Sequence, residues 1–198
     1  IPETARAEEL SLSEWIALTN FKSGQQFSAD HAQDVHAEMF DVVDDQNHVV
    51  RQASRFEVHG QRLKHRAVHI FVLNRHGELF LQRRSRWKDA HPLRWDSSAA
   101  GHLNAGQGYD ETAPRELMEE LGIEANCQMI GTLPASAATG WEFVQLYRAE
   151  HDGPFRLAPA EIDSGNFFTL EQLDRWTQSR PRDFANGFLE CYKLFRRL

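Results

Sequence analysis

Residues 115–123 read Arg-Glu-Leu-Met-Glu-Glu-Leu-Gly-Ile, and they carry a clear helical pattern. Leu117 and Leu121 lie four positions apart, with Ala113 one turn earlier, so one face of this helix should be buried. Gly122 follows at the place of a C-terminal helix cap. Pro114 would remove a backbone hydrogen bond deeper in a helix, so we expect the helix to begin near residues 110–112 and to run for about three turns.

Three acidic residues share this short helix. Glu116, Glu119 and Glu120 are three and four positions apart, which predicts that their carboxylates lie close together on a face turned away from Leu117 and Leu121. Like charges so close repel one another unless a cation joins them, and hard ions such as Mg²⁺ prefer oxygen ligands. The alternative is a solvated acidic helix face, which is common for a bare Glu-x-x-Glu-Glu pattern.

The rest of the chain shows the signals of a mixed structure. Thr169-x-x-Gln172 predicts a capped helix, and aromatic residues at helical spacing predict that a C-terminal helix from Asp183 docks by an aromatic face. The first 37 residues, with a capping pattern at Ser11-x-x-Glu14, precede the strand patterns of the chain, and we interpret them as an appendage. Strands are predicted at 40–43, 48–50, 66–73, 78–82, 128–132, 143–147 and 166–168. We expect the first four to form two hairpins within one mixed or antiparallel sheet.

Composition narrows the class of protein. The 198 residues carry a net charge of −7, with a pI near 5.8, which argues against broad binding to nucleic acid because that requires a basic face. The longest apolar stretch is far too short to cross a bilayer. Cys127 and Cys191 have no metal-ligand spacing and read as thiols in a reducing compartment, so we expect a cytoplasmic protein.

The frame around the helix is distinctive: Gly101, five residues, Gln107, seven residues, then residues 115–123. This resembles the Nudix box, whose pattern differs only in having Glu where Gln107 stands. The resemblance implies an α/β (α+β) domain over residues 38–198 with a mixed sheet sandwiched between helices. It also implies an enzyme that uses Mg²⁺ or Mn²⁺ to cleave a diphosphate linkage, acting on a small-molecule diphosphate.

The resemblance carries over to particular residues. Glu116, Glu119 and Glu120 would bind the metal, Arg115 would orient them, and Gly101 would allow close backbone approach. The base that takes a proton from water would be Glu119, Glu120, Glu142 or Glu161. A basic cluster could meet substrate phosphates, or it could be a solvated strand end. Its members are Arg83, Arg84, Arg86 and Lys88.

Other residues resemble the Nudix subgroup related to isopentenyl diphosphate isomerase. These are His65-Arg66-Ala67, Gln82-Arg83-Arg84-Ser85, Lys88 and Gly101-His102. The catalytic cysteine of that isomerase would fall at Ala100, so the proton relay lacks an acid there, although Glu142 aligns with the isomerase's catalytic glutamate. Three hypotheses therefore stand: a hydrolase, an isomerase, and a catalytically silent Nudix binding module.

The departure at Gln107 keeps the third hypothesis open. Gln retains hydrogen-bonding reach without the charge, so we expect a weaker contact with Arg115 and reduced activity. His65, His69 and His102 could ligate a transition metal as in the isomerase, but hydrogen-bonding or packing roles are favoured. Core or rim positions are likewise favoured for Trp87, Trp95 and Trp141 over stacking on a ligand. The substrate beyond the diphosphate is not specified, and exposed sheet edges would allow a homodimer.

Overall fold

The computed structural model describes residues 38–198, so the appendage predicted for the first 37 residues, with its Ser11-x-x-Glu14 pattern, lies outside the described part. The strands are β1 (Met39–Val43), β2 (Val49–Ser54), β3 (His65–Leu73), β4 (Leu79–Arg84), β5 (Trp95–Asp96), β6 (Ala99–His102), β7 (Gln128–Leu133), β8 (Glu142–Glu150) and β9 (Ile162–Phe168). The helices are α3 (Arg55–Gln61), α4 (Tyr109–Glu116), α5 (Leu170–Ser179) and α6 (Asn186–Phe195). A π-helical turn η2 (Leu117–Leu121) and a 3₁₀ turn η3 (Pro181–Asp183) complete the set.

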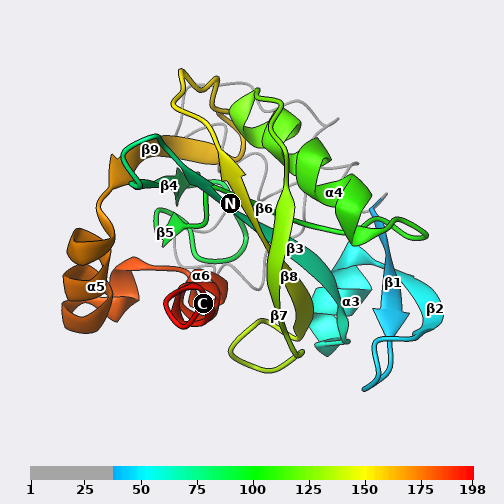
Figure 1. The fold of residues 1–198 in the computed structure, drawn as a ribbon. Coiled ribbons are helices and arrows are strands. Elements are labelled where there is room, and N and C mark those ends of the chain that lie inside the picture. The colour runs from blue at the N-terminus through cyan, green and yellow to red at the C-terminus, as the bar shows by residue number, and fades with distance from the viewer. Residues whose placement is uncertain (1–37) are drawn as a thin grey trace, which may run out of the picture.

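A mixed sheet of seven strands forms the centre of the molecule (Figure 1). Strand β3 pairs in parallel with β8 over its whole length, from His65 opposite Glu142 to Leu73 opposite Glu150. The pairs β3–β6, β4–β5, β4–β9 and β7–β8 are antiparallel. The prediction of a mixed sheet is therefore confirmed.

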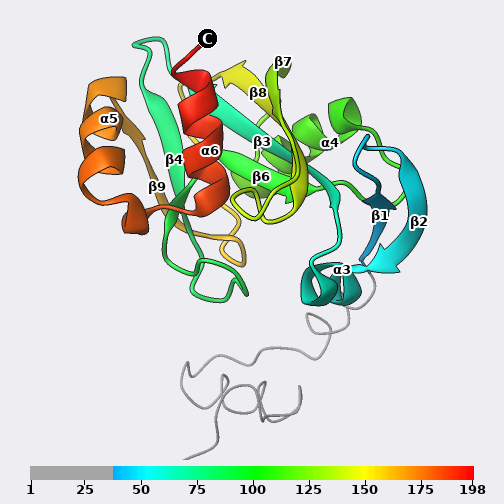
Figure 2. The same ribbon diagram turned by 90° about the horizontal axis from the view of Figure 1, so that it is seen from below.

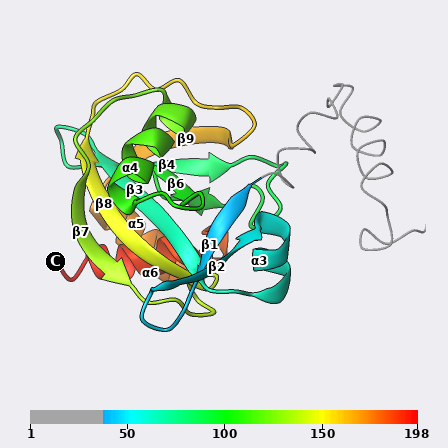
Figure 3. The same ribbon diagram turned by 90° about the vertical axis from the view of Figure 1, so that its right-hand side faces the viewer.

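Helices cover both faces of this sheet, with α4 on one side and α5 and α6 on the other (Figures 1 and 3). Alternate residues of β3 serve the two sides because successive side chains of a strand point to opposite faces. Val68, Ile70 and Val72 pack with Leu117 and Leu121. The opposite core is built of Ala67, Phe71, Leu73, Leu173, Phe188 and Tyr192. The predicted sandwich, with its aromatic C-terminal helix, is thus confirmed.

The first hairpin departs from the prediction. Strands β1 and β2 form a separate two-stranded sheet, and the expectation that both hairpins enter one sheet was wrong. Helix α3 follows β2 directly and turns the chain away before β3 begins (Figures 1 and 2). Phe40, Val42, Ala53 and Val58 of this unit form a small core of their own.

The helix of residues 109–121 begins earlier than predicted. Helix α4 starts at Tyr109, so Pro114 is its sixth residue and lies beyond the first turn. After Glu116 the backbone widens into η2, a π-helical turn that ends at Gly122 with φ of 65°. The predicted C-cap at Gly122 is confirmed, because this left-handed conformation suits glycine. A π-helical turn often marks a functional site.

The sheet opens between β3 and β4, which pair only at Leu73 and Leu79. Short strands β5 and β6, which the sequence did not predict, occupy the opening. Ser98 lies between the diverging strands: its hydroxyl accepts from the Val72 N–H at 2.8 Å and donates to the Phe80 carbonyl. This opening brings β6, the end of β4 and helix α4 with η2 to one place.

Candidate active site

Glu116 ends α4 and points at β6. Its side chain is only 7% exposed, and a Cβ added at Gly101 would overlap the Glu116 carboxylate. Gly101 therefore provides the space in which this carboxylate lies. Burial, reinforced by Glu119 and Glu161, raises the pKa of Glu116 to about 7 although Arg115 and Lys88 oppose the shift.

Glu120 lies beside it with only neutral partners. It is 4% exposed, and its Oε2 accepts from Gln82 Nε2 at 2.8 Å and from the Ala100 N–H at 3.2 Å. Within residues 38–198 no lysine, arginine or histidine forms an ion pair with it. Burial, and then the charge of Glu116, raise the pKa of Glu120 well above its ordinary value. The solvated acidic face considered above is excluded for both buried glutamates.

Glu119 differs from its two neighbours because its side chain is 56% exposed. Arg115 connects it to the buried pair: one guanidinium nitrogen lies 2.8 Å from Glu119 Oε2, and another lies 2.8 Å from Glu116 Oε1. Arg115 also donates to the His102 carbonyl at 3.2 Å. The predicted orienting partner thus contacts two of the three glutamates, and Glu120 is held by Gln82 instead.

These glutamates line a cavity of about 470 Å³. Lys88 and Arg84 line it as well; Lys88 forms an ion pair with Glu161, and Arg84 pairs with Asp96 at 2.8 Å. The other two members of the basic cluster lie elsewhere. Arg83 and Arg86 are outside the lining, and each pairs with Asp163.

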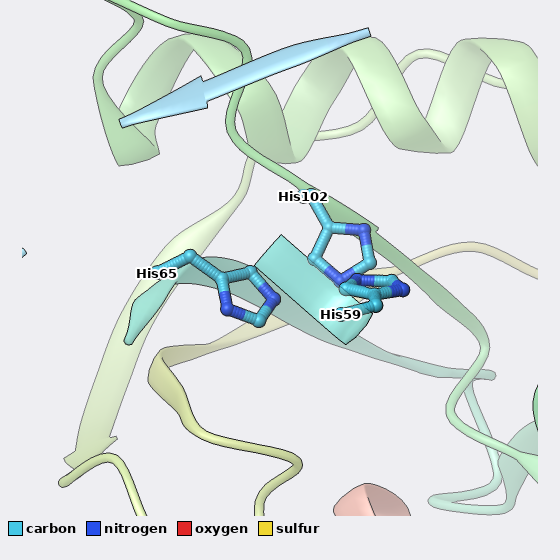
Figure 4. Close-up of side chains that lie close together, drawn as sticks. All are labelled: His59, His65 and His102. Atoms are coloured by element: carbon cyan, nitrogen blue, oxygen red, sulfur yellow. The ribbon is translucent and has the colours of Figure 1, made fainter. Parts of the chain in front are cut away.

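A second group of possible ligands stands at another part of the cavity. His59 on α3, His65 on β3 and His102 on β6 have ring nitrogens within 4.8 Å of one another, and their rings face a common point (Figure 4). Glu142 adds a carboxylate, with Oε1 3.1 Å from His102 Nε2 and 3.8 Å from His65 Nε2. The buried His65 Nε2 has no hydrogen-bond partner among residues 38–198.

The histidines of this group are held neutral. Burial, followed by the charge of His102, lowers the pKa of His65 to about 4. Burial also lowers the pKa of His59, and that of His102 well below its ordinary value. Neutral imidazole is the form that binds metals.

The remaining candidates occupy several environments. His69 stands apart from the other three histidines and contacts Ser97 Oγ through Nδ1 at 2.7 Å. Trp95 packs edge-on against Phe168 and Trp176 in the core, whereas Trp141 lines the cavity. Gln107 does not make the expected contact with Arg115: its buried Oε1 and the buried Arg115 Nε both lack hydrogen-bond partners in the described part of the chain.

The two groups suit different cations. Glu116 and Glu120 offer oxygen atoms in a buried place where Arg115 pairs with Glu116 alone and no cationic side chain within residues 38–198 pairs with Glu120, which fits a hard divalent ion. Three imidazoles with one carboxylate fit a transition metal. The sequence interpretation missed His59 and the role of Gln82, although Ser54-x-x-Glu57 is a helix-start pattern that could have located α3 and with it His59.

The NUDIX domain family model matches residues 63–187, which is most of the chain and includes α4, β6 and β8. The chain belongs to the Nudix hydrolase family. It is 36% identical to an uncharacterized Nudix hydrolase of Yersinia pestis over 166 residues, which cover 80% of this chain and 85% of the relative. The crystal structure of DR0079 from Deinococcus radiodurans has a TM-score of 0.69 and 29% identity, and the match covers 81% of this chain and 98% of that one.

One relative bears on the isomerase hypothesis. The chain is 32% identical over 161 residues to a Serratia proteamaculans protein named isopentenyl-diphosphate Delta-isomerase, with 79% of this chain and 90% of the relative covered. At the place where the resemblance puts the isomerase's catalytic cysteine, this Nudix chain has Ala100.

None of the helices within residues 38–198 has the length and hydropathy that a membrane crossing requires.

Proposed function

We propose that this Nudix protein is a Mg²⁺- or Mn²⁺-dependent hydrolase that cleaves the diphosphate linkage of a small organic diphosphate. The observation that supports this most strongly is the pair of buried carboxylates around Gly101. Glu116 and Glu120 would hold the cation, with Glu119 completing the set from the exposed side of η2. A divalent cation bound there would neutralise charge on the phosphate oxygens.

The geometry of Glu120 supports its role as a ligand. Both of the hydrogen bonds that it makes with residues 38–198 go to Oε2, which fixes the carboxylate and leaves Oε1 available to the cavity that these residues line. Arg115 holds Glu116 and Glu119 in place through its two ion pairs. These residues therefore prearrange the carboxylates before any cation binds.

Hydrolysis also needs a base that takes a proton from the water attacking phosphorus, as the anhydride P–O bond breaks. We favour Glu142 over Glu161. Glu142 faces neutral histidines, whereas Glu161 is occupied by its ion pair with Lys88. Lys88 and Arg84 would contact the phosphates, because both line the cavity. Arg83, which the sequence suggested for the same task, lies outside the lining.

Two observations favour other functions. The His59, His65, His102 and Glu142 group, with the isomerase-named relative, favours an isomerase, but Ala100 offers no acid at the position of the cysteine. The unpartnered Gln107 Oε1 favours a silent binding module. Gln107→Glu tests the module: activity that appears only in this variant would identify a natural chain that has lost catalysis.

The experiment is release of phosphate or nucleoside monophosphate from a panel of nucleoside diphosphates and triphosphates, nucleotide sugars, dinucleotides and prenyl diphosphates. Each is assayed with Mg²⁺, with Mn²⁺ and with a chelator, for the wild type and Glu120→Gln. We expect metal-dependent turnover that the variant loses while its circular dichroism spectrum is unchanged. Conversion of isopentenyl diphosphate to its isomer without phosphate release would refute the hydrolase.

A further inference from the structure

The cavity extends past the glutamates to the other side of the sheet. Glu116 and Glu120 belong to α4 and η2, which cover one face of β3. His69 alternates with Val68 and Ile70 along β3, so it lies on the face that α6 covers. Yet His69 and the start of α6 line the same cavity as the glutamates. A substrate whose diphosphate lies at the glutamates can therefore reach His69 with its remaining part.

His69 is held in a fixed position with one nitrogen free. The side chain is 5% exposed, and its Nδ1 contacts Ser97 Oγ at 2.7 Å. The other ring nitrogen, Nε2, makes no hydrogen bond within residues 38–198. Because His69 lines the cavity, this nitrogen is open to a ligand atom there.

The first turn of α6 lies next to that nitrogen. A Cβ added at Gly187 would stand 3.1 Å from both His69 Nε2 and Cε1, so the glycine keeps space open beside the ring. The N-cap residue Ala185 supplies no side-chain hydrogen bond to the helix start. The N–H groups of Asn186 and Gly187 have no partner inside the helix, and both residues line the cavity.

We propose that His69 and the first turn of α6 form a specificity subsite, which binds a hydrogen-bond-accepting group on the substrate beyond its diphosphate. The inference rests on the proposed hydrolase function and deepens it. A carbonyl, hydroxyl or phosphate oxygen there would pair with the backbone N–H groups and with His69 Nε2. A hydrocarbon chain would leave these groups unpaired, and a site built for hydrogen bonding rejects such analogues strongly.

The test compares Gly187→Ala and His69→Phe with the wild type. Gly187→Ala places a methyl group against His69, and alanine favours a helix over glycine, so the variant should fold. Gly60→Ala is the matched control, because Gly60 lies in α3 with open space around it and outside the cavity lining. The probes are CDP, ADP, isopentenyl diphosphate and inorganic diphosphate.

We expect the ratio of kcat/KM for the better nucleotide to that for inorganic diphosphate to fall about tenfold in Gly187→Ala and His69→Phe, mainly through KM. Gly60→Ala should keep the wild-type ratio. An unchanged ratio, or a wild type that prefers isopentenyl diphosphate to both nucleotides, would overturn the subsite.

Calorimetric binding of the same probes in Ca²⁺ separates this proposal from the hydrolase function. Nucleotide binding that both variants weaken, without turnover in the wild type, would support the subsite and refute the hydrolase. Turnover of inorganic diphosphate with no nucleotide binding would support the hydrolase and refute the subsite.

Discussion

A single methyl group at residue 101 would occupy the place of the Glu116 carboxylate. Gly101 is therefore constrained by its neighbour across the site, from strand β6 to helix α4. Five residues separate Gly101 from Gln107, and seven more separate Gln107 from Arg115. This spacing places Gly101 of β6 against Glu116 at the end of α4.

Gly101→Ala should displace Glu116 and lower turnover by about 100-fold, because displacements near 1 Å at a catalytic group have effects of that order. Metal affinity, measured by Mn²⁺ paramagnetic resonance, should fall with it. Gly108→Ala is the matched control: Gly108 is the N-cap residue of α4, and nothing lies within 4 Å of a Cβ added there. Equal effects of the two substitutions would contradict the account.

The raised pKa of Glu116 predicts a dependence of stability on pH. The folded state binds this proton up to about pH 7, whereas the unfolded chain releases it near pH 4.5. In the absence of metal, the contribution of Glu116 to the free energy of unfolding should therefore fall as the pH rises from about 4.5 to 7.

Glu116→Gln removes that titration. The free energy of unfolding of the variant, relative to that of the wild type, should therefore increase by up to about 3 kcal/mol between pH 4.5 and pH 8. The difference between the two proteins reports Glu116 together with its effect on Glu120, whose pKa the charge of Glu116 raises, while the histidines with lowered pKa affect both proteins alike. Urea unfolding in a chelator measures it. A difference independent of pH would show that the carboxylate is ionised throughout.

The residues of the motif were predictable because local spacing places them. Glu116 and Glu120 lie on one helix by their spacing, but their role as metal ligands, and that of Gly101, came only with the resemblance to the Nudix box. Gln82 was not predictable as a partner of Glu120, since 38 positions separate them and only the folded sheet brings them together. The helix of His59 had a local start pattern at Ser54-x-x-Glu57, but its approach to His102, 43 positions away, had no local signal. The burial of two glutamates beside an exposed third was also beyond the pattern, because the π-helical turn changes the direction of the side chains.

At the scale of elements, helix α3 has the role of carrying His59 to the site. Its N-cap Ser54 accepts from the Glu57 N–H at 3.3 Å. Helix α5 begins in the same way, with Thr169 accepting from the Gln172 N–H at 3.2 Å. The two caps are chemically alike, but α3 contributes Arg55 and His59 to the cavity lining, whereas no residue of α5 lines the cavity.

Ser54→Ala and Thr169→Ala should each lower the free energy of unfolding by about 1 kcal/mol, since each removes one helix cap. Only Ser54→Ala should also weaken Co²⁺ binding at the histidine group, because only that cap orients His59. Denaturant unfolding and Co²⁺ absorption spectra measure the two effects. Weaker Co²⁺ binding in Thr169→Ala would show that general stability, and not the position of α3, controls the histidines.

Strands with long apolar runs and helices with capping patterns were predictable, since their signals are local. Strands β5 and β6 have two and four residues and leave little pattern to detect. The separate β1–β2 sheet was mispredicted because hairpin signals specify a pair of strands and carry no information about which sheet it joins. Helix α3, which was not predicted from the sequence, lies between β2 and β3 and separates the small sheet from the large one.

At the scale of the whole molecule, two buried carboxylates oppose folding until a cation neutralises them. Mg²⁺ or Mn²⁺ at millimolar concentration should therefore raise the Tm of the wild type, since a ligand that binds only the folded state stabilises it. Glu120→Gln should show a smaller rise and a higher Tm without metal. An equal metal-induced rise in both proteins would place the bound cation elsewhere.

The most direct test of the central claim is a crystal structure with Mn²⁺, using anomalous scattering to locate the ion. We predict a peak roughly 2.0–2.3 Å from carboxylate oxygens of Glu116 and Glu120, and the loss of this peak in Glu120→Gln. Any peak at His59, His65 and His102 should persist in that variant. Manganese bound only at the histidines, with the Glu116 and Glu120 carboxylates free of it, would contradict the account.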